Sequence, residues 1–104
     1  MSKKIIDLLN GLQEQFVTHV FGSAATSLTA GTPGTLATYQ TIDVEKEGYT
    51  PIGVVGLSVS HGSSYHPEAS LNGSTLYLNF YRAMSSAYSV PAKDVFVTIL
   101  YKKA

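Results

Sequence analysis

Apolar residues recur with a helical period near the start of the chain. In residues 3–16, KKIIDLLNGLQEQF, four of them are separated by 4, 3 and 4 positions, and a fifth widens the stripe. These residues are Ile5, Leu8, Leu9, Leu12 and Phe16. The spacing predicts an amphipathic helix, which we assign to residues 1–17.

A helix this short has to bury its apolar stripe. An isolated helix of about 14 residues is marginally stable in water. Two solutions are open, packing on its own domain or association with copies of itself. We expect residues 1–17 to act as an oligomerisation stalk.

From about residue 17 the pattern becomes that of strands separated by turns. Thr32-Pro33-Gly34 places proline and glycine in the order that suits the centre of a type II turn. Asn72-Gly73 marks a second turn, at the end of a polar segment, 61–74, that reads as a long loop. TLATYQTIDV predicts an exposed strand with Leu36, Ile42 and Val44 on one face.

The segment TLYLNFYRAM, residues 75–84, alternates most regularly. Leu76, Leu78 and Phe80 face one way. Tyr77, Asn79 and Tyr81 face the other way. This is the pattern of a strand with one face on a core and one face on the surface.

Two further strands are apolar on both faces, TPIGVVGLSVS from residue 50 and DVFVTILYKK from residue 94. In so small a domain, an outer apolar face implies that something covers it. The N-terminal helix and a neighbouring subunit are the candidates, and the scarcity of charge favours the subunit. Gly53 and Gly56 indicate a bulge or a close approach by another backbone.

Five or more strands with regular turn signals and no second helical pattern predict a mainly β fold. We expect residues 18–104 to form one antiparallel, jelly-roll-like β-sandwich, preceded by the short α-helix. The length of 104 residues agrees with a single domain.

Composition narrows the possible partners. Seven basic and seven acidic residues cancel, and no basic patch points to nucleic acid. No apolar run is long enough for a membrane span, and no secretory signal is expected at the N-terminus. The chain contains no cysteine, which excludes disulfides and thiolate metal sites.

The residues that could carry catalysis do not form a recognisable set. Ser58 lies in GLSVS, which lacks the second glycine and the following helix of a nucleophile elbow. His61 and His66 are five positions apart, a spacing that is not diagnostic of a metal site. Carboxylates are few and scattered. We therefore expect a protein that is not an enzyme and that holds no metal or cofactor.

Seven tyrosines and no tryptophan indicate a recognition surface. A tyrosine can offer an apolar ring and a hydroxyl together, although cross-strand packing would use the same residues. We expect ligand or partner contacts from one strand and from the adjoining segment 61–70. The residues are Tyr77, Asn79, Tyr81, His61, Tyr65 and His66.

Three stretches together, GYTPIGVVGLSVSHG, LNGSTLYLNFYRA and DVFVTILYKK, carry a family resemblance. They resemble the small β-rich head domains of bacteriophage tail-fibre and baseplate proteins, over residues 32–103. The resemblance implies a trimer behind a short stalk, located in the virion after synthesis in the host cytoplasm. It implies receptor binding to a host-surface saccharide, or attachment to another virion protein. No binding residue is carried over by it.

Two other functions stay open from the sequence. The chain could be a stand-alone carbohydrate-binding module that uses the same tyrosines. It could also be a capsid-decoration protein, since only a helix precedes the β domain.

Overall fold

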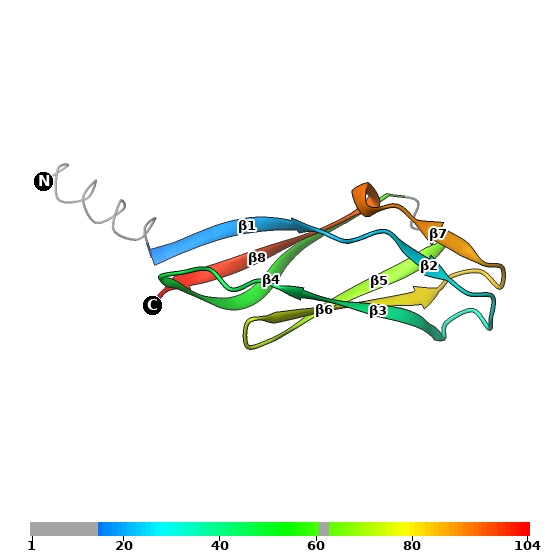
Figure 1. Ribbon diagram of the computed structural model, residues 1–104, viewed down its shortest axis with the longest axis horizontal. Helices are drawn as coiled ribbons and strands as arrows, with labels where there is room; N and C mark the ends of the chain where they lie inside the picture. The colour runs from blue at the N-terminus through cyan, green and yellow to red at the C-terminus, as the bar shows by residue number, and fades with distance from the viewer. Residues whose placement is uncertain (1–14, 61–62) are drawn as a thin grey trace, which may run out of the picture.

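A computed structural model describes residues 15–60 and 63–104, which form a mainly β protein (Figure 1). Eight strands and one 3-10 helix follow one another along these residues. They are β1 (Phe16–Gly22), β2 (Thr26–Leu28), β3 (Leu36–Asp43), β4 (Tyr49–Val59), β5 (Tyr65–Asn72), β6 (Thr75–Arg82), β7 (Tyr88–Val90), η1 (Ala92–Asp94) and β8 (Val95–Lys103). The mainly β class predicted from the turn signals is confirmed.

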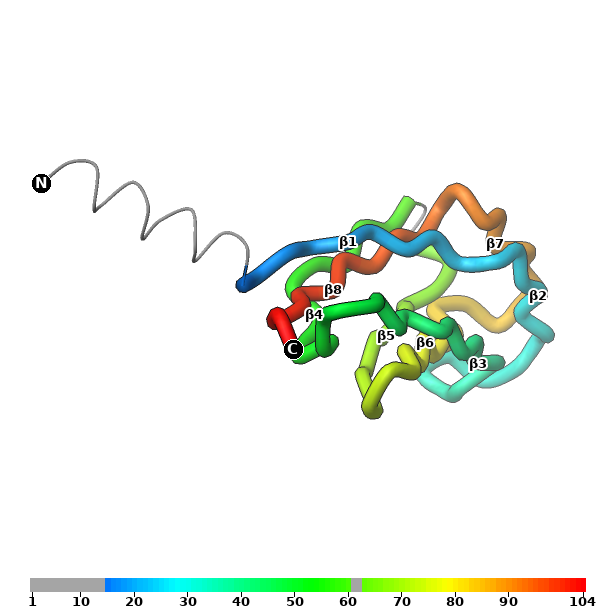
Figure 2. The backbone as a smooth tube through the Cα atoms, turned by 60° about the vertical axis from the view of Figure 1, so that its left-hand side comes forward, coloured from blue at the N-terminus to red at the C-terminus, as the bar shows by residue number. Residues whose placement is uncertain are grey.

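The strands form three antiparallel sheets with a nested order of pairing. The first strand pairs with the last, β2 pairs with β7, and β3 pairs with β6. The sheet orders are β1-β8-β4, β2-β7 and β3-β6-β5. In Figures 1 and 2 the small β2-β7 sheet lies at the end of the molecule opposite the C-terminus.

The core lies between the two three-stranded sheets and is supplied mainly by their central strands. From β6 come Leu76, Leu78 and Phe80, each fully buried. From β8 come the alternate residues Val95, Val97, Ile99 and Tyr101, also fully buried. The predicted alternation of residues 75–84 is confirmed. Burial of these apolar side chains is the main force that holds the sheets together.

Two buried tyrosines connect the core to the surrounding backbone. The hydroxyl of Tyr101 donates a hydrogen bond to the carbonyl of Val44, which is itself fully buried. The hydroxyl of Tyr65 donates to the carbonyl of Ser60 at 2.7 Å. Burial raises the pKa of both phenols above the ordinary value of 10.0, with smaller contributions from nearby acidic groups.

The predicted turns are present. Gly34 has a φ of +89°, and the amide of Thr35 donates to the carbonyl of Thr32 at 3.2 Å. This is the hydrogen bond expected for a type II turn with glycine at its third position. Gly73, with a φ of +61°, lies in the tight connection between β5 and β6.

Three predictions need correction. Phe16 opens β1 and is not the last residue of a helical stripe; the other stripe residues, Ile5, Leu8, Leu9 and Leu12, lie outside the described residues. The segment expected as a loop, 61–74, is largely the strand β5. Its polar residues occupy the outward positions of an edge strand, where Pro67 is tolerated because edge strands leave amide positions unpaired.

The third correction concerns Leu36, which does not share a face with Ile42 and Val44. A register shift between Leu36 and Thr38 places Leu36 opposite Tyr81, and Leu36 is 47% exposed. Val44 is fully buried, and Ile42 packs against the core. A bulge reverses the alternation of a strand, so one inserted residue moved Leu36 to the outer face.

The loop between β2 and β3 is held by Arg82, at the end of β6. Its Nε and Nη2 donate to the carbonyl and hydroxyl of Thr29 at 2.9 and 2.8 Å. Its Nη1 donates to the hydroxyl of Thr35 at 2.8 Å and to the carbonyl of Leu36 at 3.0 Å. A Cβ built on Gly31 would lie 2.5 Å from the Arg82 Nε. Glycine at 31 therefore makes room for the guanidinium.

We expect Gly31→Ala to destabilise the protein by about 1–3 kcal/mol, because the new methyl group displaces the guanidinium from its hydrogen bonds. Equilibrium denaturation with urea measures the change. In an Arg82→Ala background the same substitution should have little effect, because the group that collides is absent. Equal costs in both backgrounds would show that the guanidinium does not set the requirement for glycine.

Candidate contact surface

The outer side of the β3-β6-β5 sheet is the strongest candidate for a binding surface. Tyr77, Asn79 and Tyr81 alternate along β6 with fully buried residues, so they project away from the core. All three are partly exposed, between the side chains of the two flanking strands. This confirms the face on which the alternation placed them.

The register of the sheet adds residues from both neighbouring strands. Asn79 lies between Tyr39 on β3 and Glu68 on β5. Tyr81 lies between Leu36 on β3 and His66 on β5. Residues directly opposite one another in adjacent strands share a face and touch. We call this set the tyrosine face: Leu36, Tyr39, His66, Glu68, Tyr77, Asn79 and Tyr81.

The polar groups of the tyrosine face are available to a ligand. Within the described residues, none of its side-chain hydroxyl, amide, imidazole or carboxylate groups is hydrogen-bonded. Tyr39 is the most open of its aromatic residues, at 59% exposure. The face thus combines three aromatic rings with an amide, an imidazole and a carboxylate. Rings offer stacking surfaces, and the polar groups offer donors and acceptors for hydroxyls.

The contact residues expected from the sequence are only partly brought together. His66 joins Tyr77, Asn79 and Tyr81 on the face. Tyr65 does not, because it is fully buried and its hydroxyl is bonded to Ser60, so it belongs to the core. His61 lies outside the described residues.

Sequence reasoning did not select Tyr39 and Glu68. Side chains along a strand point alternately to its two faces, and the neighbours of Tyr39 in β3 belong to the inner face. This alternation was a usable signal that Tyr39 points outward. Glu68 was treated as a loop residue, because β5 contains a proline and four polar side chains. Which strands flank β6 depends on pairing between distant segments, and the pattern of a single strand does not encode that.

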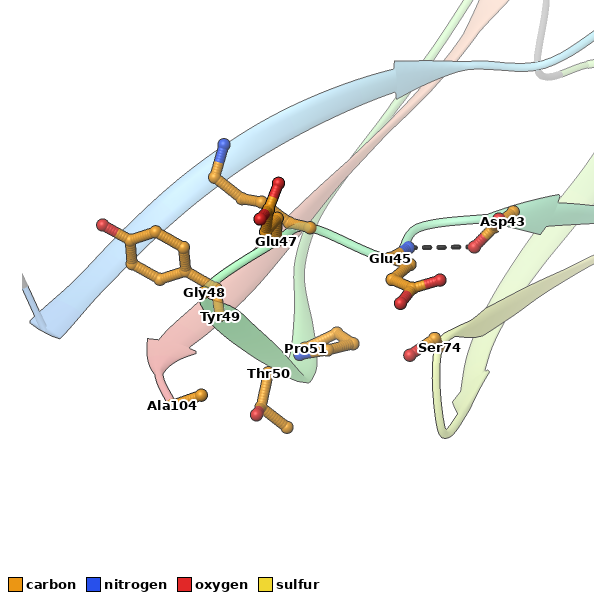
Figure 3. Close-up of a pocket in the computed structure, with 10 residues that line it drawn as sticks. Asp43, Glu45, Glu47, Gly48, Tyr49, Thr50, Pro51, Ser74 and Ala104 are labelled. Carbon is orange, nitrogen blue, oxygen red and sulfur yellow. Dashed lines mark hydrogen bonds between the residues drawn. The ribbon is translucent and has the colours of Figure 1, made fainter.

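A hollow of about 630 Å³ lies between the turn that precedes β4 and the β5-β6 turn (Figure 3). It is lined by Asp43, Glu45, Lys46, Glu47, Gly48, Tyr49, Thr50, Pro51, Ser74 and Ala104. The amide of Glu45 donates to a carboxylate oxygen of Asp43 at 3.0 Å, and the Lys46 ammonium lies 5.7 Å from the Tyr49 ring centre. Residues 15–60 and 63–104 contain no group of three or more potential ligands arranged to hold a metal ion.

Comparisons with protein families, curated proteins and solved structures find no match to this chain. In the part of the chain that the structure describes, no helix is long and apolar enough to cross a membrane. Function is therefore inferred from the chemistry of the tyrosine face.

Proposed function

We propose that the chain is a non-enzymatic structural and adhesion protein of a virion, a homotrimeric head like those of tail fibres or baseplates. The tyrosine face would contact a host-surface saccharide, with another virion protein as the alternative partner. The observation that carries the proposal is the set of unpaired polar groups and tyrosine rings, Tyr39 exposed and the other two partly exposed, on one face of one sheet.

The dimensions of the tyrosine face suit a short oligosaccharide. Tyr77 and Tyr81 lie four residues apart on β6, about 13 Å along the strand. Tyr39, Asn79 and Glu68 cross three strands, about 10 Å in all. Sugar rings present an apolar side to aromatic rings and hydroxyls to amides and carboxylates. A shallow surface with both kinds of group meets these two needs.

The order of strand pairing supports the proposal that the fold is a jelly-roll-like β-sandwich. Pairing first with last, second with seventh and third with sixth is what a rolled sandwich of eight strands requires. Jelly rolls are common in viral capsid and lectin domains, an analogy of fold and not of site. Two pairings differ from that arrangement: β8 pairs with β4 as well as with β1, and β5 pairs with β6 and not with β4.

A glycan array probed with the full chain tests the saccharide partner. We expect retention of at least one glycan class, and a loss of about tenfold or more for Tyr81→Ala, because a stacking ring is removed. Thr18→Ala, an exposed change on the opposite sheet, is the matched control and should bind normally.

The array also separates the alternatives. Retention that is insensitive to Tyr81→Ala and Tyr39→Ala would contradict a saccharide site on the tyrosine face. No retention of any glycan would leave a virion protein as the proposed partner. Strong retention by a strictly monomeric chain would favour a stand-alone carbohydrate-binding module.

A further inference from the structure

The two sheets are joined differently on the two sides of the sandwich. On one side the edge strands β4 and β5 contact each other directly. On the other side, where β1 and β3 are the edge strands, a side chain of β3 makes a bridge. The Gln40 side chain accepts a hydrogen bond from the amide of Ala24 at 3.1 Å and donates one to the carbonyl of Ala24 at 2.7 Å. Ala24 follows the end of β1, so this bridge lies beyond one end of that strand.

Nearer the middle of β1, the facing sheet leaves an inward position uncovered. The register places His19 opposite Ile99 of β8, and Ile99 is fully buried, so His19 lies on the inner face of its sheet. The neighbouring inward residues, Val17 and Phe21, pack against the core. His19 is nevertheless exposed. An inward position that stays exposed marks a gap between the two sheets.

This gap is a hollow of about 170 Å³, which we call the β1 hollow. Its lining comes from β1, from β8 and from the segment that joins β3 to β4. The two rings that β1 contributes lie 4.8 Å apart between their centres and are tilted by 53°. The lining residues are His19, Phe21, Glu45, Lys46 and Tyr101.

Buried groups hold the walls of the β1 hollow in place. The hydroxyl of Tyr101 donates to the carbonyl of Val44, the residue before Glu45. The amide of Val44 donates to the carbonyl of Ser74 at 2.9 Å, and Val44 is fully buried. The backbone that carries Glu45 and Lys46 is therefore fixed where it enters the hollow. A site that exists before its ligand arrives loses less conformational entropy on binding.

The polar groups of the β1 hollow are free to meet a ligand. Within residues 15–60 and 63–104, the His19 imidazole and the Glu45 carboxylate make no hydrogen bond or ion pair. The Lys46 ammonium lies over the Tyr49 ring, 5.7 Å from its centre, and has no carboxylate partner in the same ranges. The charges of Glu45 and Lys46 are opposite, so the lining favours an uncharged ligand.

We propose that the β1 hollow binds one uncharged sugar ring at the end of a glycan. A protein cavity of about 150 Å³ holds one benzene molecule, so the β1 hollow has room for one six-membered ring. Phe21 and Tyr101 offer apolar ring surface. Glu45 offers acceptors to sugar hydroxyls, and Lys46 and His19 offer donors.

Other ligand classes suit the β1 hollow less well. A wholly apolar ring would take the carboxylate and the ammonium out of water without giving them a partner. An ionic ligand of either sign would meet a like charge across a short distance. The site goes beyond the proposed function, because it shares no residue with the tyrosine face and lies between the sheets.

NMR titration of the full ¹⁵N-labelled chain tests the inference. The probes are the methyl glycosides of glucose, galactose and N-acetylglucosamine. We expect saturable shifts of the amide signals of His19, Glu45 and Lys46 with at least one probe. His19→Trp should raise the dissociation constant about tenfold or more, because the larger ring fills the hollow. Glu45→Ala should weaken binding by removing the acceptor, whereas Thr18→Ala, on the opposite face of β1, should bind normally.

His19 and Glu45 are exposed, so both variants should keep the wild-type midpoint of unfolding, which separates lost binding from misfolding. The inference is overturned by the absence of saturable shifts with every glycoside, or by shifts that His19→Trp and Glu45→Ala leave unchanged. Saturable shifts with phenol but with no glycoside would overturn sugar as the ligand class.

The same titration distinguishes this site from the tyrosine face. Shifts at the β1 hollow that persist in Tyr81→Ala would support two separate sites. A hollow that binds no glycoside, in a chain that a glycan array retains through Tyr81, would overturn this inference and leave the proposed function standing.

Discussion

Replacing Phe80 with alanine should lower the free energy of unfolding by about 3–5 kcal/mol, a large part of the stability of a domain this size. Phe80 is fully buried on β6, the central strand of its sheet, and its ring centre lies 6.0 Å from that of Tyr65. Removal of the ring loses its transfer free energy and leaves a cavity between the two sheets. Urea or thermal denaturation followed by circular dichroism measures the change.

The neighbouring residue provides the control. Tyr81→Ala removes a ring of similar size from the same strand, but on the outer, partly exposed side. It should cost only about 1 kcal/mol, mostly from lost cross-strand contacts. Similar costs for the two substitutions would contradict the assignment of Phe80 to the core and of Tyr81 to the surface.

Tyr101→Phe should destabilise the protein by about 1–3 kcal/mol although it removes a single oxygen atom. The Tyr101 hydroxyl donates to the carbonyl of Val44, and both residues are fully buried. Without the hydroxyl, that acceptor loses its partner in a place that water does not easily reach. Chemical denaturation of the two proteins under identical conditions gives the difference.

Tyr65→Phe is the matched control for the second prediction. Tyr65 is equally buried, but its acceptor is the carbonyl of Ser60, an exposed residue where water can replace the hydroxyl. Its cost should therefore be under about 1 kcal/mol. An equal or larger loss for Tyr65→Phe would contradict the importance of burial at the acceptor.

The same two phenols give an alkaline dependence. The pKa of each phenol is higher in the folded state than in the unfolded state. Their contribution to the free energy of unfolding is therefore complete below pH 10 and is lost as the pH rises through the folded pKa. The wild type should therefore lose stability above pH 10 more steeply than Tyr101→Phe.

The parts of the fold that follow from local pattern were predictable, and β6 is the clearest case. Its strict alternation gave both the core residues and the outward tyrosines. The Pro33-Gly34 turn was predictable for a similar reason, since glycine there adopts a φ that other residues avoid.

What depended on register was not predictable. A bulge near Leu36 moved that side chain to the outer face, and the bulges in β4 exposed Ile52 and Val55. Tyr65 was taken for a surface residue because its neighbours are polar, whereas it begins a strand and points into the core. Tyr39 joined the tyrosine face through its pairing with Asn79, 40 residues further along the chain, and Glu68 joined it through pairing with the same Asn79.

The pairing of β1 with β8 also sets the order in which this protein can fold. β8 is the central strand of its sheet, and it is made after every other strand. While the chain is being synthesised, β1 and β4 have no ladder partner among the described strands, and their apolar residues stay uncovered. Closing a loop of some 80 residues is slow, as in other folds dominated by distant contacts. The completion of this sheet therefore waits for the last strand to leave the ribosome, and a ribosome that stalls before β8 would leave an aggregation-prone chain.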